Sequence, residues 1–167
     1  MSDPIVNIVG VGNTLMGDDG VGPVALEAIC RRGVGVGVRL HDAGLAVSDV
    51  LGQLDPNDPL IIIDALRAGG EPGTVYKATI DEPSLWGDTL VGQFSLHELS
   101  IAPALRIEAM IGREFVDVTA FGVEPEEVQW GAPLSDAVTG ALEKLTAAVL
   151  AHAEAKLNSA AAGAQLR

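Results

Sequence analysis

The sequence of 167 residues contains a single cysteine, Cys30, and no long apolar run. A lone cysteine excludes an internal disulfide and a metal site built from a cysteine cluster. A membrane-spanning helix would need about 18 or more consecutive apolar residues. The first residues, MSDPIVNIVG, also lack the basic start and long apolar core of a signal peptide. We therefore expect a soluble, cytoplasmic protein.

Basic residues are scarce as well. Ten Lys and Arg stand against 23 Asp and Glu, which gives a formal net charge of −13. The basic residues are scattered, and an acidic surface without a basic stripe repels nucleic acids and anionic lipids. We therefore expect no nucleic-acid or membrane partner. An acidic surface is suited to a basic protein partner, and it equally favours solubility.

Aromatic residues make up only 4% of the sequence, whereas 48% of the residues are hydrophobic and 20 are glycines. This composition favours an α/β domain with aliphatic layers and tight turns. A chain of this length forms one domain with a substantial core.

Short apolar segments predict the strands of this domain. The run PLIIIDA at 59–65 is continuously apolar, which is typical of a strand buried on both faces of a parallel sheet. The segment 73–80 alternates and fits an edge strand. The predicted strands are 4–10, 38–42, 59–65, 73–80 and 115–124.

Helical patterns fall between these strands. One helix is predicted from Pro23 to about Arg32, a second after the turn that begins at residue 43, and a long one after Leu134. The alternation of strands and helices predicts a single three-layer α/β domain with a twisted, mainly parallel sheet flanked by helices. We assign residues 1–156 to the domain and 157–167 to a flexible C-terminal tail.

A further helix is expected to begin at Ser95, because Ser95 and Glu98 have the spacing of a capping box. His97 would then lie in the first turn. Pro103 falls inside the same pattern and would kink or divide the helix.

The stretch GVGNTLMGDDGVGP at 10–23 begins like a phosphate-binding loop. The dinucleotide fingerprint G-x-G-x-x-G fails here, because Leu15 stands at the third glycine position. Asp18 and Asp19 lie at the positive end of the following helix and would repel a pyrophosphate. We therefore expect no tight nucleotide binding, although a nucleotide- or small-molecule-binding module is the alternative class. The acids could also simply cap the helix.

Carboxylates facing a cation fit the pattern better. Asp42 and Asp64 each end a predicted strand, and Asp19 follows the first one, so all three are expected at one edge of the sheet. Together with His97 or His41 they would offer oxygen and nitrogen ligands, which suit Ni²⁺ or Zn²⁺. His41 is adjacent to Asp42 and points to the opposite face, so at most one of these two residues belongs to the site.

Two other residues are interpreted as uninvolved. His152 lies on the last helix, and Cys30 lies in the middle of a helix, where it is expected to be packed rather than catalytic. No serine or cysteine nucleophile with a neighbouring base is apparent.

Five sequence blocks, in the same order, are similar to those of the hydrogenase maturation endopeptidases. These proteases trim the C-terminal extension from the large-subunit precursor of nickel–iron hydrogenases. The resemblance covers residues 5 to about 150. The blocks are GVGNTLMGDDGVG at 10–22, DAG at 42–44, IIIDAL at 61–66, SLHEL at 95–99 and FGVEPEEVQWGAPLS at 121–135.

The resemblance implies an aspartic-type endopeptidase that acts after nickel insertion, with Asp19, Asp64 and His97 as catalytic residues and metal ligands. Many members carry glutamate at the position of Asp19. Ni²⁺ is expected to arrive with the substrate, held by cysteines of the precursor, and other divalent ions could occupy the site in vitro. A non-catalytic nickel chaperone would use the same ligands.

The remaining candidates have supporting roles. Asn13, Asp18 and Asp42 are placed as contacts to the metal ligands or to the substrate. The block at 121–135 is interpreted as a structural turn that leads into the final helix.

Overall fold

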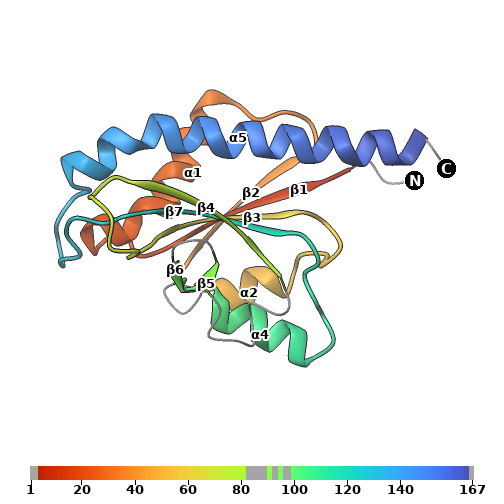
Figure 1. Ribbon diagram of the computed structural model, residues 1–167, viewed down its shortest axis with the longest axis horizontal. Helices are drawn as coiled ribbons and strands as arrows, with labels where there is room; N and C mark the ends of the chain where they lie inside the picture. The colour runs from red at the N-terminus through yellow and green to blue at the C-terminus, as the bar shows by residue number, and fades with distance from the viewer. Residues whose placement is uncertain (1–3, 82–89, 92–93, 96–98, 166–167) are drawn as a thin grey trace.

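The structure is a computed structural model that describes residues 4–81, 90–91, 94–95 and 99–165. A five-stranded sheet lies between two layers of helices (Figure 1). The strands are β1 (Val6–Val11), β2 (Val38–Gly44), β3 (Leu60–Ala65), β4 (Val75–Ile80), β5 (Leu90–Val91), β6 (Phe94–Ser95) and β7 (Val118–Val123). The helices are the 3₁₀ turn η1 (Gly17–Gly20) and the α-helices α1 (Val21–Arg32), α2 (Val47–Leu51), α4 (Ala102–Met110) and α5 (Asp136–Gln165).

The sheet has the strand order β2-β1-β3-β7-β4. All neighbours are parallel except β4, which runs antiparallel to β7 at one edge. The central strands β1 and β7 are buried along their whole length, whereas β4 alternates, as its sequence predicts. The predicted single α/β domain with a mainly parallel sheet is confirmed.

Period-two alternation sends the strand side chains into two cores, one on each face of the sheet. Ile8 and Ile61 pack with α1 and α5, while Val9 and Ile62 pack with α2 and α4. Figure 1 shows α1 and α5 together on one face and α2 and α4 on the other. Because both faces are covered, ligands have access mainly at the strand ends.

Helix α1 lies unusually close to the strands because glycine occurs where the two meet. A side chain at Gly22 would collide with the carbonyl oxygens of Val11 and Ile63. This close approach fixes the start of α1, and η1 before it, over the carboxyl ends of β1 and β3.

The helix predicted from Ser95 is wrong. Ser95 belongs to strand β6, which pairs with β5, and helix α4 begins only at Ala102. Pro103 therefore lies in the first turn of α4, where its missing N–H costs no hydrogen bond, and it does not divide the helix. His97 lies outside the described residues.

The last helix is longer than predicted. α5 continues to Gln165, so most of the segment assigned to a tail is helical, and Leu157 packs against the core. The flexibility of this segment stays a prediction. In the part of the chain that the structure describes, no helix combines the length and apolar character needed to span a membrane.

Candidate functional site

The loop between β1 and α1 turns back sharply at Gly12. Gly12 has φ +127°, and a side chain there would collide with the backbone carbonyl of Asp19. The turn brings the backbone amide of Asn13 to the Oδ2 atom of Asp19 at 2.8 Å. Glycine is therefore required at this position to hold Asp19 at the carboxyl end of β1.

Asp18 is fully buried and fully hydrogen bonded. Its Oδ2 accepts the backbone amides of Glu126 at 2.8 Å and Glu127 at 3.0 Å, and the hydroxyl of Ser135 at 2.8 Å. Its Oδ1 accepts the amide of Ser135 at 2.7 Å. Burial alone would raise the pKa of Asp18, but these hydrogen bonds outweigh it and hold the pKa below its ordinary value.

The expectation that Asp18 contacts the substrate is therefore wrong for this structure. A side chain with 0% exposure and four hydrogen bonds has no free surface to offer. Asp18 instead anchors η1 to the segment between β7 and α5. Nor does it cap a helix, because the N-caps of η1 and α1 show no side-chain hydrogen bond.

Asp64 is also fully buried, yet it is only partly hydrogen bonded. It lies near the end of β3, and its Oδ2 accepts the backbone amide of Ser100 at 3.0 Å. Its Oδ1 is buried and has no hydrogen-bond partner among the described residues. Burial raises the pKa of Asp64 to about 7, and the negative charge of Asp19 adds to the rise, while hydrogen bonds from Ser100 oppose it.

A small cavity of about 190 Å³ opens at Asp19 and at residues that adjoin the buried Asp64. Asp19 lines it together with Ser100, which binds Asp64, and with Ala65, the next residue in the chain. Pro125 and Val128 form part of the wall. The structure thus brings Asp19 and Asp64 together at the carboxyl ends of β1 and β3, as predicted.

Asp42 does not join them. Its side chain is exposed, its Oδ1 accepts the amide of Gly44 at 3.0 Å, and it lines a neighbouring hollow with Asn13. The expectation of three carboxylates at one site is therefore reduced to two. His41 points away, as anticipated for a neighbour of Asp42 in a strand, and its Nε2 lies 2.9 Å from the side-chain oxygen of Asn7.

The donor set fits a divalent cation in chemistry but is incomplete among the described residues. They contain no group of three His, Cys, Asp or Glu side chains placed to hold a metal ion. The two carboxylates are oxygen donors, and the Oδ1 of Asp64, which has no partner among the described residues, is an atom that a cation would satisfy. His97, the predicted nitrogen ligand, stays a prediction.

Sequence reasoning missed several residues around the cavity. Arg67 and Ser100 line it. Leu15 and Trp130, in the same segments as Asp19 and Val128, are 55% and 69% exposed. The amide of Gly131 donates to the carbonyl of Leu15 at 2.8 Å, which joins the two exposed segments. The block at 121–135 therefore does more than form a turn, because it also builds one side of the site. Trp130 was the signal in the sequence that could have drawn attention to this block, because only 4% of the residues are aromatic.

Cys30 also differs from its prediction. It is exposed at the surface of α1 rather than packed. Its neighbour Ile29 takes the inward position and is fully buried.

Comparisons with known proteins agree with this architecture. The sequence model of the family described as HycI, hydrogenase maturation protease, matches residues 26–152. The chain is 31% identical over 147 residues to the hydrogenase 2 maturation protease of Escherichia coli, which covers 86% of this chain and 87% of that protein. It is 32% identical over 146 residues to the hydrogenase expression/formation protein HoxM of Azotobacter vinelandii, covering 86% of this chain and 69% of that protein.

A third relative is longer than this chain. HupD of Thiocapsa roseopersicina is 33% identical over 129 residues, and the match spans 76% of this chain but 57% of that protein. Among solved structures, the hydrogenase maturating endopeptidase HybD from E. coli superimposes with a TM-score of 0.73 at 30% identity, covering 89% of this chain and 91% of that one.

The protein is a three-layer α/β domain with two carboxylates at its strand ends, and it is similar to these proteins in sequence and in structure. These similarities define its class, the endopeptidases of hydrogenase maturation. The chain belongs to the hydrogenase maturation protease family.

Proposed function

We propose that the protein is a nickel-dependent endopeptidase that removes the C-terminal extension of a nickel–iron hydrogenase large-subunit precursor after nickel insertion. The observation that carries this proposal is the buried Asp64, which lies close enough to Asp19 to feel its charge and has one carboxylate oxygen without a partner among the described residues. Leaving a buried polar atom unpaired costs about 1–3 kcal/mol. Such a cost is expected where an atom is kept available for a ligand.

Nickel belongs to the substrate in this proposal. Asp19 and Asp64 supply carboxylate oxygens to the ion that the precursor carries, and His97 supplies a ring nitrogen. The backbone amide of Asn13 orients Asp19, and that of Ser100 orients Asp64. Removing a group that orients a metal ligand in this way typically lowers metal affinity or activity by about 10–100-fold.

The bound ion can serve recognition alone, or it can polarise the scissile carbonyl or activate a water molecule. A carboxylate of the pair can also act as general base. In each case the protease distinguishes loaded from unloaded precursor, because only the loaded form offers a cation to the two carboxylates. Cleavage then follows metal insertion.

The nucleotide-binding alternative loses support from the geometry of the loop. The amide of Asn13, which a phosphate would need, is already bound to the carboxylate of Asp19. We expect calorimetry to show no micromolar binding of NAD or ATP.

The decisive experiment compares nickel-loaded with nickel-free precursor, using the mass of the product as readout. Wild-type protein should shorten only the loaded form. Asp64→Asn and His97→Ala should leave it intact, whereas Asp19→Glu should retain substantial activity. Asp49→Asn, at an exposed position on α2, is the matched control.

Efficient trimming of nickel-free precursor, or by Asp64→Asn and His97→Ala, would refute nickel gating. Transfer of nickel without any shortening would identify a nickel chaperone instead.

A further inference from the structure

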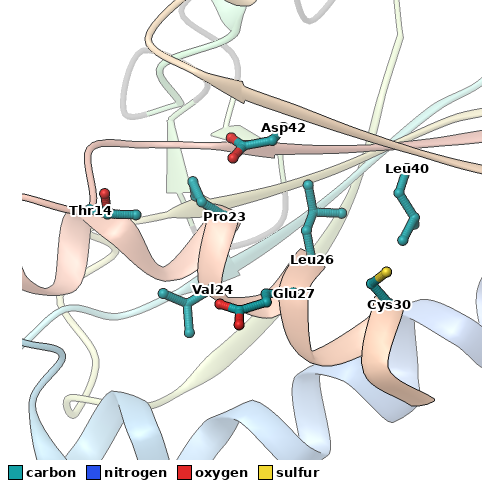
Figure 2. Close-up of a pocket in the computed structure, with 8 residues that line it drawn as sticks. All are labelled: Thr14, Pro23, Val24, Leu26, Glu27, Cys30, Leu40 and Asp42. Carbon is teal, nitrogen blue, oxygen red and sulfur yellow. The ribbon is translucent and has the colours of Figure 1, made fainter. Parts of the chain in front are cut away.

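A second concave region lies apart from the Asp19–Asp64 cavity, between helix α1 and strand β2. It has a volume of about 410 Å³. Figure 2 shows Thr14 on one side, Leu40 and Cys30 on the other, and Asp42 between them. Leu26 and Leu40 provide apolar surface, and Glu27 and Asp42 provide carboxylates. We refer to this region as the α1–β2 groove.

The groove continues toward the candidate site. An adjoining hollow of about 380 Å³ shares Thr14, Pro23 and Asp42 with it and extends to Gly12 and Asn13. The amide of Asn13 is the group that binds the carboxylate of Asp19. A chain lying in the groove would therefore arrive at the loop that holds Asp19.

The groove also borders an open sheet edge. Strand β2 is the last strand of the sheet on this side, and within the described part of the chain it pairs only with β1. An extended polypeptide can add to such an edge through main-chain hydrogen bonds, with alternate side chains entering pockets on one face. Leu40 and Asp42, two residues apart on β2, both face the groove, which matches this period.

Charge narrows the choice of occupant. Glu27 and Asp42 are both exposed, so their carboxylates are available to a ligand. Glu27 forms an ion pair with Arg31 at 3.5 Å, and both side chains of that pair are 69% exposed. Because an exposed pair of this kind contributes little, it offers weak competition to an incoming cation. The groove is therefore suited to an apolar segment that carries a basic side chain.

We propose that the α1–β2 groove binds the precursor segment next to the scissile bond as an added strand along β2, with Glu27 and Asp42 selecting a basic side chain in it. This inference rests on the proposed function. It adds a binding surface for the polypeptide to the site that binds the ion.

The first test measures occupancy of the groove directly. Cys30 is the only cysteine and is exposed in the groove, so its alkylation by a maleimide reports on the groove without any engineering. The probe is a synthetic peptide that spans the bond cut in the precursor, as located from product masses. At saturation it should slow alkylation of the full-length protein on the order of tenfold. Unchanged alkylation would overturn the proposal.

Two modified peptides test the binding mode. N-methylation of alternate backbone amides should abolish protection of Cys30 in one register and spare it in the other, because only one set of amides faces β2. Replacing the basic residue by glutamine should weaken protection. Equal protection by both methylated peptides would exclude strand addition, and an unchanged effect of the glutamine peptide would exclude charge selection.

The second test uses kinetics with nickel-loaded precursor. Glu27→Lys should raise KM on the order of tenfold and leave kcat unchanged, since the groove binds substrate away from the reacting bond. Glu154→Lys makes the same charge change at an exposed position on α5 and should change neither constant. Equal KM values for both variants would overturn the proposal and leave the protease function intact. If wild-type protein fails to cut the precursor, the proposed function fails. The binding of a polypeptide in the groove is then tested separately, by whether a peptide centred on the precursor's last metal-binding cysteine slows alkylation of Cys30.

Discussion

Asp18 and Asp64 are two fully buried aspartates with opposite surroundings. Asp18 accepts four hydrogen bonds over both of its oxygens, and its pKa is lowered. Asp64 has an oxygen without a partner among the described residues, and its pKa is raised to about 7. Burial is thus the same for the two side chains, and the difference lies in hydrogen bonding. Asp18 uses both of its oxygens to hold the fold together, whereas the unpaired oxygen of Asp64 supports the ligand role proposed for it.

The largest effect on stability is expected at Asp18. Asp18→Ala removes the buried acceptor of three backbone amides and one hydroxyl, and a donor left unpaired away from water costs about 1–3 kcal/mol. We expect a loss of at least about 3 kcal/mol in the free energy of unfolding, measured by urea denaturation. Asp49→Ala, at an exposed position, should change it by less than about 0.5 kcal/mol. A loss below about 1 kcal/mol at Asp18 would remove the contrast with Asp64.

Asp64→Asn should separate stability from activity. The amide side chain keeps an oxygen for the Ser100 amide and removes a buried charge, so the unfolding free energy should fall by no more than about 1 kcal/mol or should rise. Processing of nickel-loaded precursor should fall by about 100-fold or more, because in the proposed function Asp64 binds the ion directly. Denaturation and product mass, measured on the same preparation, check both parts. A destabilisation as large as that of Asp18→Ala would show that Asp64 is also a structural residue.

Gly12→Ala should have an intermediate effect on both properties. The new side chain meets the carbonyl of Asp19 in a backbone conformation that disfavours alanine. We expect a loss of about 1–3 kcal/mol in stability and a slower processing rate, because Asp19 must move. Gly35→Ala is the control, since nothing lies within 4 Å of a side chain at that position. Equal behaviour of the two variants would mean that the Gly12 turn does not position Asp19.

The smallest expected effect is on the pH dependence of stability, at His152, a partly buried histidine outside the candidate site. Burial lowers the pKa of His152, and the charges of Lys77 and Lys156 add to this effect, while Asp117 opposes it. Below about pH 6.5 the unfolded chain therefore binds a proton that the folded chain resists, so stability falls as the pH decreases.

His152→Gln should reduce this acid-side loss by less than about 1 kcal/mol, because His152 is only partly buried. Urea denaturation from pH 7.5 down to 5.5 measures it. Burial also lowers the pKa of His41, so the stability of the variant should still decrease with pH by the amount that His41 contributes. An identical slope in the variant would show that His152 does not contribute.

The sequence alone predicted the sheet and the convergence of Asp19 with Asp64. Unbroken apolar runs mark buried strands, and parallel strands bring their carboxyl ends to one edge, so local pattern was sufficient for both. It could not distinguish Asp18 from Asp19. That distinction depends on hydrogen bonds to Glu126, Glu127 and Ser135, which lie 108, 109 and 117 residues further along the chain.

Two other errors have local causes. The capping-box spacing at Ser95 is satisfied by many sequences that form no helix, and here Ser95 pairs in a strand. The exposure of Cys30 follows from the position of β2 at the sheet edge, because beyond the edge strand the far side of α1 has no further strand to cover it. Periodicity identified β4 as an edge strand, but it revealed neither the pairing of Ser95 nor the position of β2 at the other edge.

The bonds of Asp18 also determine when the protease can become active during its own synthesis. The turn carrying Asp19 is made early, but the amides that anchor it come from Glu126 to Ser135. A nascent chain that ends before Ser135 cannot close the turn onto its partner segment. Translation through Ser135 must therefore precede anchoring of the turn that carries Asp19, so we expect a ribosome-bound or truncated chain that ends before Ser135 to be inactive toward its substrate.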